Sequence, residues 1–260
     1  MDDYPYGMNF NTTRRGLVIL VPAIFALTGC AQDADSGFSG DASSINEISH
    51  SLWTYSWLAA AVVGVFTAIL IVWPAIFHRA PKNGPEFPKQ TQYNVPVEVA
   101  YTIIPFVIVA VLFYFTVVKE NEIVKPQASV QHEIEVSGFQ WSWQFTYLDE
   151  GENVQVTGTP AKPPVLVVPQ GERVRYTIVS NDVVHGFWIP EFMIQMQNLP
   201  GVTNYLEFTA NKLGDFPGRC NILCGRNHAQ MLFTVRVVTP AEYQTYISNL
   251  KLETEKAGQA

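Results

Sequence analysis

Two long runs without a formal charge constrain the fold of this chain more than any other feature. Residues 52–77 form a run of 26 such positions, and residues 99–118 form a run of 20. About 20 helical residues at 1.5 Å each cross a hydrocarbon core of roughly 30 Å. We therefore predict two membrane helices, at residues 52–77 and 97–119. The length of the runs argues against the alternative, a pair of buried soluble helices.

The connection between the two runs indicates their orientation. Residues 78–96 contain Arg79, Lys82 and Lys89 against a single acid, Glu86. Short loops rich in Lys and Arg are retained on the cytoplasmic side of a membrane. We therefore predict a cytoplasmic loop here, with the outer ends of both helices on the opposite face.

The N-terminus has the pattern of an export signal. Arg14-Arg15 precedes the uncharged residues 16–28, which is the order of a signal peptide. The stretch ends in Leu27-Thr28-Gly29-Cys30, which resembles a bacterial lipobox. We predict a signal peptide at residues 1–29 and lipidation of Cys30. The alternative is a short additional hydrophobic helix.

The segment that follows Cys30 is short and polar. Residues 31–44 are rich in Asp, Ser, Gly and Ala and offer little to bury. Residues 30–51 are therefore predicted to be a flexible tether along the outer membrane surface. Together these segments predict a multi-pass protein of a bacterial cell membrane, with its C-terminal part on the outer face.

From Gln131 onward, the long apolar runs give way to short alternating ones. Segments rich in β-branched and aromatic residues are separated by Pro and Gly over residues 130–240. This pattern predicts a Greek-key β-sandwich or barrel of about 110 residues, an ordinary size for one domain. A C-terminal helix and tail are expected at residues 241–260. The expected strands are residues 132–136, 140–147, 153–157, 165–168, 173–179, 204–209 and 230–238.

A cluster of metal-ligating residue types lies near the end of this region. Cys220, Cys224, His228 and Met231 fall within twelve residues, and His185 lies in a strand-like segment upstream. A tetrahedral zinc site would use four of these side chains and leave the methionine idle, whereas a mononuclear blue copper site needs one cysteine. A disulfide would use only the two cysteines. A two-copper centre would use all five.

Composition excludes several other classes. The net charge of −7 argues against nucleic acid as a partner, because phosphates require a basic face. Three cysteines form no disulfide framework. The chain has no Cys-x-x-Cys-His sequence for covalent haem attachment, so no haem is expected in this chain.

A signal segment, a two-helix hairpin and an exported β domain with His185 and Cys-x₃-Cys-x₃-His-x₂-Met resemble subunit 2 of haem-copper cytochrome c oxidase. The resemblance implies a membrane-anchored all-β protein whose cupredoxin-like domain, at residues 130–240, holds the dinuclear copper A centre. It implies cytochrome c as the electron donor, with the catalytic haem-copper subunit 1 and other oxidase subunits as partners. Oxygen would be reduced to water at haem in subunit 1, coupled to proton pumping.

The resemblance also implies a role for each ligand. Cys220 and Cys224 correspond to the bridging thiolates, and His185 and His228 to the terminal imidazoles. The remaining two are weak ligands. They are the Met231 thioether on one copper and the Ile222 carbonyl on the other.

Two further residues match functional positions of the family, and Asp182, three residues before His185, is a candidate for contact with a partner. Trp141, in Gly138-Phe139-Gln140-Trp141-Ser142-Trp143, corresponds to the residue through which electrons enter, although a strand aromatic by itself indicates packing. Glu98 corresponds to the acid at the mouth of a proton-uptake path, although a carboxylate is also favoured there by the helix dipole. Asp182 is predicted to help dock a basic cytochrome c.

One position departs from the family. A Glu that binds magnesium or manganese is usual where this chain has Ile222, so the chain is not expected to supply that ligand. A quinol-fed oxidase subunit is a second interpretation, and it would predict loss of the copper ligands, all of which are present. A membrane-tethered copper carrier and a zinc-stabilised lectin-like domain are alternatives from other classes.

Overall fold

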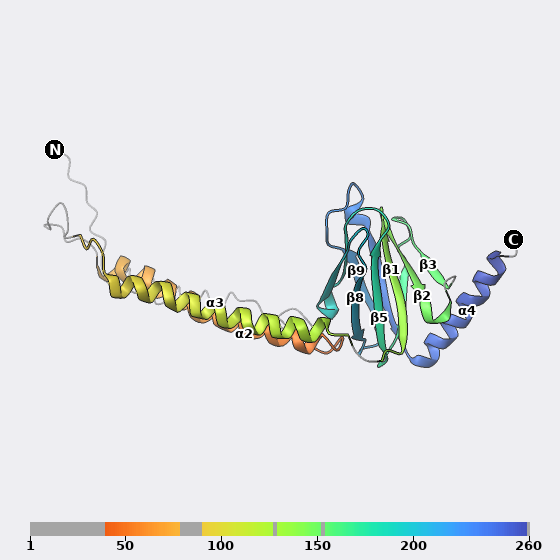
Figure 1. The fold of residues 1–260 in the computed structure, drawn as a ribbon, viewed down its shortest axis with the longest axis horizontal. Helices are drawn as coiled ribbons and strands as arrows, with labels where there is room; N and C mark the ends of the chain where they lie inside the picture. Colours follow the sequence, from red (N-terminus) through yellow and green to blue (C-terminus); the bar gives the residue numbers. More distant parts are fainter. Residues whose placement is uncertain (1–39, 79–89, 127–128, 152–153, 259–260) are drawn as a thin grey trace, which may run out of the picture. The chain divides into compact units, whose positions relative to one another are not determined.

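The computed structural model describes residues 40–78, 90–126, 129–151 and 154–258. The predicted signal peptide at residues 1–29 and the predicted lipidation at Cys30 lie outside this part. The described elements are two long helices, a β-sandwich and a C-terminal helix (Figure 1).

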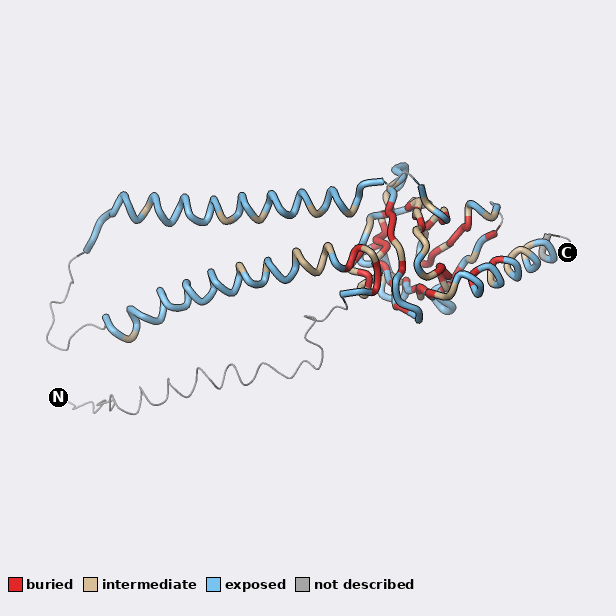
Figure 2. The backbone as a smooth tube through the Cα atoms, turned by 90° about the horizontal axis from the view of Figure 1, so that it is seen from below, coloured by how far each residue is buried: buried red, intermediate tan, exposed pale blue. Residues whose placement is uncertain are grey.

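The two long helices are α2 (Asn46–Phe77) and α3 (Val95–Val124), and they contact each other. Each is long and apolar enough to cross a membrane, and most of their residues are exposed (Figure 2). An apolar helix without a polar face or a protein cover suits lipid surroundings. The predicted helical hairpin is confirmed. Both helices extend several residues beyond the predicted spans.

Part of the predicted tether is packed against the β-sandwich. The side chains of Ala42, Ser43 and Asn46 are buried. Asn46 donates a hydrogen bond from Nδ2 to the carbonyl of Glu191 over 2.7 Å, and the N–H of Ser44 donates to the carbonyl of Thr209 over 2.9 Å. These long-range bonds, which composition does not reveal, bind the segment before α2 to the sandwich.

The sandwich consists of two five-stranded sheets. Their strand orders are β3-β2-β1-β5-β8 and β4-β10-β9-β6-β7. The pairs β1–β5 and β4–β10 are parallel, and the other pairs are antiparallel. The predicted β-sandwich is confirmed. The strands are β1 (His132–Phe139), β2 (Ser142–Tyr147), β3 (Gln155–Thr157), β4 (Val165–Pro169), β5 (Arg173–Ser180), β6 (His185–Ile189), β7 (Ile194–Asn198), β8 (Asn204–Thr209), β9 (Gly214–Cys220) and β10 (Leu232–Val238).

Four features of the sheets differ from the expected strands. The segment predicted as one strand at residues 140–147 is divided, because β1 continues to Phe139 and β2 starts at Ser142. Strands β7 and β9 were not predicted, and β6 was indicated only as a strand-like segment around His185. β9 contains Gly-Asp-Phe-Pro-Gly-Arg, a sequence with low strand propensity, and it is held between β10 and β6 by their backbones.

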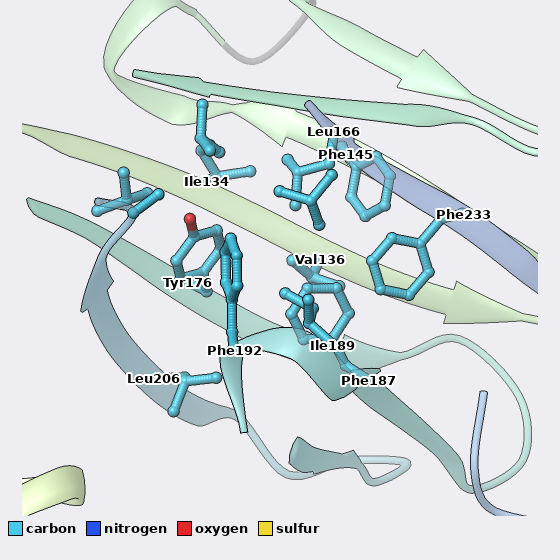
Figure 3. Close-up of a cluster of buried hydrophobic side chains, with 14 of the residues drawn as sticks. Ile134, Val136, Phe145, Leu166, Tyr176, Phe187, Ile189, Phe192, Leu206 and Phe233 are labelled. Carbon is cyan, nitrogen blue, oxygen red and sulfur yellow. The ribbon is translucent and has the colours of Figure 1, made fainter. Parts of the chain in front are cut away.

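The hydrophobic core lies between the two sheets (Figure 3). Phe187 and Phe233 are stacked, with centroids 4.9 Å apart, and Tyr176 stacks on Phe208 at 4.5 Å. Such aromatic pairs add specific geometry to burial. The core residues labelled in Figure 3 are Ile134, Val136, Phe145, Leu166, Tyr176, Phe187, Ile189, Phe192, Leu206 and Phe233.

Helix α4 (Pro240–Gly258) packs on the sandwich next to His132, the first residue of β1. Its buried side chains include Tyr243 and Ile247. Thr239 and Glu242 form a capping box, since the Thr239 N–H donates to the Glu242 carboxylate over 2.9 Å and the Glu242 N–H donates to Thr239 Oγ1 over 3.3 Å.

Candidate metal centre

Two neighbouring strands bring the first ligands together. His185 is the first residue of β6 and Cys220 is the last residue of β9, and Phe187 pairs with Cys220 across these antiparallel strands. The N–H of Asn221 donates to the carbonyl of Gly186 over 3.2 Å, which extends the contact beyond the ladder. A residue 35 positions upstream in the sequence therefore lies beside the cysteine motif.

The loop after β9 carries the other ligands. It turns at Gly225, whose φ of +125° favours glycine, and continues into a short 3₁₀ helix, His228–Gln230. The loop returns to β9 where the Cys220 N–H donates to the Met231 carbonyl over 2.9 Å. This closure places the imidazole and the thioether beside the two thiols.

The ligand atoms converge within a few ångströms. The Sγ atoms of Cys220 and Cys224 are 3.8 Å apart, and both cysteines are free thiols. Cys224 Sγ lies 3.6 Å from Nδ1 of His228 and 3.8 Å from Sδ of Met231. Cys220 Sγ lies 3.2 Å from the carbonyl oxygen of Ile222.

His185 completes the group. A ring nitrogen of His185 and the Sγ atoms of Cys220 and Cys224 all lie within 4.8 Å of one another. The Nδ1 atom is buried and has no hydrogen-bond partner in the part of the chain that the structure describes. Nε2 is 2.7 Å from Asp182 Oδ1. A buried, unpaired imidazole nitrogen beside two thiols is an observation that fits a metal ligand.

Asp182 is a partner of His185 within the site. Its Oδ2 accepts from the Gln140 N–H over 2.7 Å, and its Oδ1 accepts from the Val183 N–H over 2.6 Å as well as facing the imidazole. Burial acts to raise the pKa of Asp182, but the bond with His185 and the two backbone N–H groups lower it below its usual value. The carboxylate is therefore ionised and orients the ring.

The two thiols have different acidities. Burial acts to raise the pKa of Cys220, and His185 together with the Gly186 N–H more than offsets this, so that the pKa falls to about 6. Burial and the negative charge on Cys220 raise the pKa of Cys224. Without a cation, one thiolate is the favoured state at neutral pH. A bound cation would stabilise the second.

The side of the site that faces the sandwich is buried, and its rim is partly exposed to solvent. His185, Cys220, Cys224 and Met231 are buried, whereas His228 is half-buried. The Trp143 ring lies beneath His185, with centroids 6.2 Å apart. A low-dielectric pocket with one edge near solvent suits a centre that exchanges electrons with another protein.

Two glycines permit the close approach of backbone and ligands. A Cβ on Gly186 would lie 2.0 Å from Asn221 Oδ1 and 2.9 Å from Cγ1 of Ile222. A Cβ on Gly138 would lie 3.1 Å from Cδ2 of His185. These glycines and the Asp182–His185 bond were not recognised in the sequence, although an Asp three positions before a candidate His was a usable signal.

Trp141 lies directly against the metal loop. Its Nε1–H donates to the Cys224 carbonyl over 3.1 Å, and Gln140 Nε2–H donates to the same oxygen over 2.8 Å. The ring is half-buried. Gln140 is a further residue of the site that the sequence did not reveal, because its role depends on the turn between β1 and β2.

Glu98 is not part of this cluster. It lies near the start of α3, where its Oε1 accepts from the Asn94 N–H over 2.9 Å and caps the helix. From Glu98 to Val124 the helix rises about 39 Å, at 1.5 Å per residue. The α3 residues nearest the metal loop are at the other end of the helix, where Glu120 lines a cavity with Ile222.

That cavity has a volume of about 570 Å³. Its lining includes the end of α3, strand β7 and the first two residues of the metal loop, Asn221 and Ile222. The Ile222 side chain presents hydrocarbon to it and no ligating atom. The position where a family member would supply a carboxylate is therefore apolar in this chain.

The donor set has a defined chemical preference. Two thiolates, two imidazoles and a thioether are soft or borderline ligands, which favour copper over magnesium or calcium. Four of them would satisfy zinc, which would leave the fifth without a function. The residues present thus fit a copper site and use every predicted ligand.

Comparison with known proteins identifies similar chains. The family described as "Cytochrome C oxidase subunit II, periplasmic domain" matches residues 161–238, which include all the predicted ligands. The probable cytochrome c oxidase subunit 2 of Streptomyces avermitilis is 36% identical over 236 residues, covering 77% of this chain and 74% of that protein. Cytochrome c oxidase subunit 2 of Mycobacterium tuberculosis (strain H37Rv) is 31% identical over 256 residues, covering 77% and 70%.

Among solved structures, the periplasmic domain of subunit II of cytochrome oxidase of Bradyrhizobium japonicum is similar. It is 30% identical, with a TM-score of 0.45, and the match covers 48% of this chain and 97% of that chain.

Proposed function

The chain belongs to the family of cytochrome c oxidase subunit 2, and from this premise we propose that it holds a dinuclear copper A centre that accepts electrons from cytochrome c. The electrons would pass to haem in the catalytic subunit 1, where oxygen is reduced to water and protons are pumped. A subunit of this kind is part of an oxidoreductase complex. It is anchored in a membrane by α2 and α3, with the copper domain outside the cell.

The arrangement around the two thiols is the observation that carries the proposal. The two Sγ atoms are 3.8 Å apart, and a ring nitrogen of His185 lies within 4.8 Å of both. Cys220 Sγ also lies 3.2 Å from the Ile222 carbonyl oxygen, whereas Cys224 Sγ lies 3.6 Å from His228 Nδ1 and 3.8 Å from Met231 Sδ. Six donor groups around two adjacent sulfurs would suit two metal ions that share the thiolates. One tetrahedral ion would leave two of the six groups unused.

When bound, such a pair of coppers supplies a one-electron carrier whose charge is shared over both metals. The protein keeps the surroundings fixed. Asp182 holds Nε2 of His185, the Gly186 backbone packs against Asn221 and Ile222, and Gln140 and Trp141 hold the Cys224 carbonyl. A fixed, dry ligand cage keeps the reorganisation on electron transfer small.

We propose Trp141 as the residue through which electrons enter. Its half-buried ring and its hydrogen bond to the Cys224 carbonyl support this role, since one edge faces solvent and the other contacts the metal loop. Trp141→Phe keeps an aromatic ring but removes the N–H donor. We expect slower reduction by cytochrome c with unchanged copper content, and an unchanged rate would contradict the role.

Two further roles are proposed away from the copper ligands. Glu98 is proposed to receive protons at the inner face and Cys30 to be lipidated, whereas the docking role of Asp182 stays a prediction. Turnover and proton uptake of an oxidase with Glu98→Gln test the first, and mass spectrometry of the mature N-terminus tests the second. Ile222 gives this chain no side-chain ligand for an interface magnesium, so we propose none here.

The main test is spectroscopic. We expect the oxidase complex, purified from solubilised membranes, to contain two coppers per chain and a mixed-valence spin-resonance signal shared by both. Removal of copper by a chelator should abolish the signal without removing the chain from the complex. A colourless site, a mononuclear copper signal or stoichiometric zinc would contradict the proposal.

A further inference from the structure

The tip of the metal loop presents an apolar side chain to solvent. Leu223, between the two cysteines, is 81% exposed, which exceeds every other large hydrophobic residue described, including those of the membrane helices. Its neighbour Ile222 is half-buried and lines the cavity beside α3, whereas Leu223 does not line that cavity. An exposed leucine beside a functional centre is a candidate contact for another protein.

The charges around this tip are few. Three segments form the rim of the site: the Gln140–Trp141 turn, residues 181–184 and the metal loop at residues 221–231. Apart from the proposed metal ligands His228 and Cys224, their ionisable side chains are Asp182 and Arg226. The rim of the metal site therefore has one acid and one base, within a chain of net charge −7.

These two charges are not equally available to a partner. Both oxygens of Asp182 are used by His185 and two backbone N–H groups. Arg226 is exposed and forms no hydrogen bond or ion pair within the described part of the chain. A guanidinium remains charged at all relevant pH values and matches carboxylates well. Among the described residues of the rim, Arg226 is therefore the charged side chain whose hydrogen-bonding groups are free for a partner.

The charged side chains around the metal loop are mainly basic. Residues 216–238, which include most of β9, the metal loop and β10, contain Arg219, Arg226 and Arg236 but no Asp or Glu, and Asp215 near the start of β9 is the one acid of these two strands. Arg236 is paired with Asp215, whereas the Arg219 guanidinium lies 5.6 Å from the centroid of the Trp188 ring and remains exposed. The positive character extends from the loop onto the end of β9.

We infer that Leu223 and Arg226 form the docking surface for the electron donor, and that the donor is a c-type cytochrome with carboxylates around an apolar haem edge. This inference rests on the proposed function and specifies its partner. Leu223 would contact the apolar edge next to Trp141, and Arg226 would pair with a carboxylate of the donor. Charge complementarity of this kind selects partners and raises their association rate.

The experiment compares two donors that differ in charge but not in fold. A lysine-rich cytochrome c is used in its native form and after succinylation, which converts lysines into carboxylates. The zinc-substituted form of each is titrated with the purified oxidase complex, and fluorescence quenching gives the dissociation constant independently of electron transfer. We expect the succinylated donor to bind more tightly, with an advantage that decreases as ionic strength rises.

Matched variants test whether Arg226 and Leu223 contact the donor. Arg226→Glu should weaken binding of the succinylated donor about tenfold and strengthen binding of the native donor. Leu223→Ser should weaken binding of both donors by a similar factor. The controls are Lys256→Glu and Leu252→Ser, which make the same changes at exposed positions of α4. This helix packs near His132, at the opposite end of β1 from Gln140, and its variants should leave both constants unchanged.

Tighter binding of the native lysine-rich donor would overturn the inference and favour Asp182 as the docking charge. Equal effects of Arg226→Glu and Lys256→Glu would overturn it as well, as would loss of the catalytic subunit on Leu223→Ser, which would assign this leucine to subunit contact. Stopped-flow reduction separates the two proposals. A complex that binds the donor as expected but whose copper is not reduced would contradict the proposed function and leave the docking surface intact.

Discussion

His185 Nε2 lies 2.7 Å from Asp182 Oδ1, while the other ring nitrogen of His185 is buried beside two thiols and has no hydrogen-bond partner among the described residues. This relationship determines the tautomer. The proton lies on Nε2 and is donated to the carboxylate, so that Nδ1 offers its lone pair to a metal. An acid expected at the protein surface thus contacts a ligand directly.

Removal of that carboxylate should weaken metal binding. Asp182→Ala leaves Nε2 without its acceptor, and partners of metal-bound histidines typically contribute about 10–100-fold in affinity. We expect copper to be lost from the oxidase at a correspondingly lower chelator concentration, measured by metal analysis after dialysis. Glu191→Ala, also an acidic residue of the β domain, is the control. Equal copper retention in both variants would contradict the role of Asp182.

A methyl group at Gly186 should disrupt the metal loop. The added Cβ of Gly186→Ala would overlap Asn221 Oδ1 at 2.0 Å, and this atom belongs to the residue next to Cys220. We expect reduced copper content and a destabilisation of about 1–3 kcal/mol, the usual range for overpacking. Gly64→Ala, where the added Cβ meets nothing within 4 Å, is the matched control. Unchanged copper content and thermal stability would show that the loop accommodates the methyl group.

His132 should make the free energy of unfolding depend on pH. Its Nδ1 lies 2.8 Å from Asp149 and its Nε2 lies 2.7 Å from Glu172. The bond to Asp149 raises the pKa of His132, burial lowers it, and Glu172 adds to the rise, so the net shift is upward. The stabilisation is fully present below the unfolded pKa of about 6.5 and is lost as pH rises through the folded pKa.

We therefore expect His132→Gln to destabilise the chain most at pH 6 and progressively less toward pH 9. The difference at pH 6 should be about 1–3 kcal/mol, as for a buried charge-assisted bond. Thermal unfolding at several pH values measures it. An effect of His132→Gln that is constant with pH would indicate loss of packing against Tyr243 alone.

The junction before α2 should contribute to stability through Asn46. Its side chain is fully buried, and its Oδ1 accepts from both the N–H and the hydroxyl of Ser43, while Nδ2 donates to the Glu191 carbonyl. Asn46→Ala leaves buried polar groups unpaired, which costs about 1–3 kcal/mol. Proteolysis near residue 46 should then become faster in the solubilised complex. Ser51→Ala, which removes one local helix bond, should have a much smaller effect.

The membrane hairpin and most of the metal ligands are determined by local sequence. Runs of 26 and 20 uncharged residues are too long and too apolar for another environment, so their order alone indicates two spanning helices. Cys220, Cys224, His228 and Met231 lie so close in sequence that a single loop can bring them together. Neither conclusion requires long-range pairing.

The remaining features depend on contacts between distant segments. Strand β9 has a poor strand sequence and forms because β6 and β10 pair with it, and this pairing places His185 beside Cys220. Asp182 becomes a partner of His185, and the segment around Ala42, Ser43 and Asn46 becomes buried, only when the sandwich has formed. Local sequence determines which residues are available as ligands, membrane helices or charges. Tertiary structure decides which of them meet, because backbone pairing and burial act between residues that are far apart in the chain.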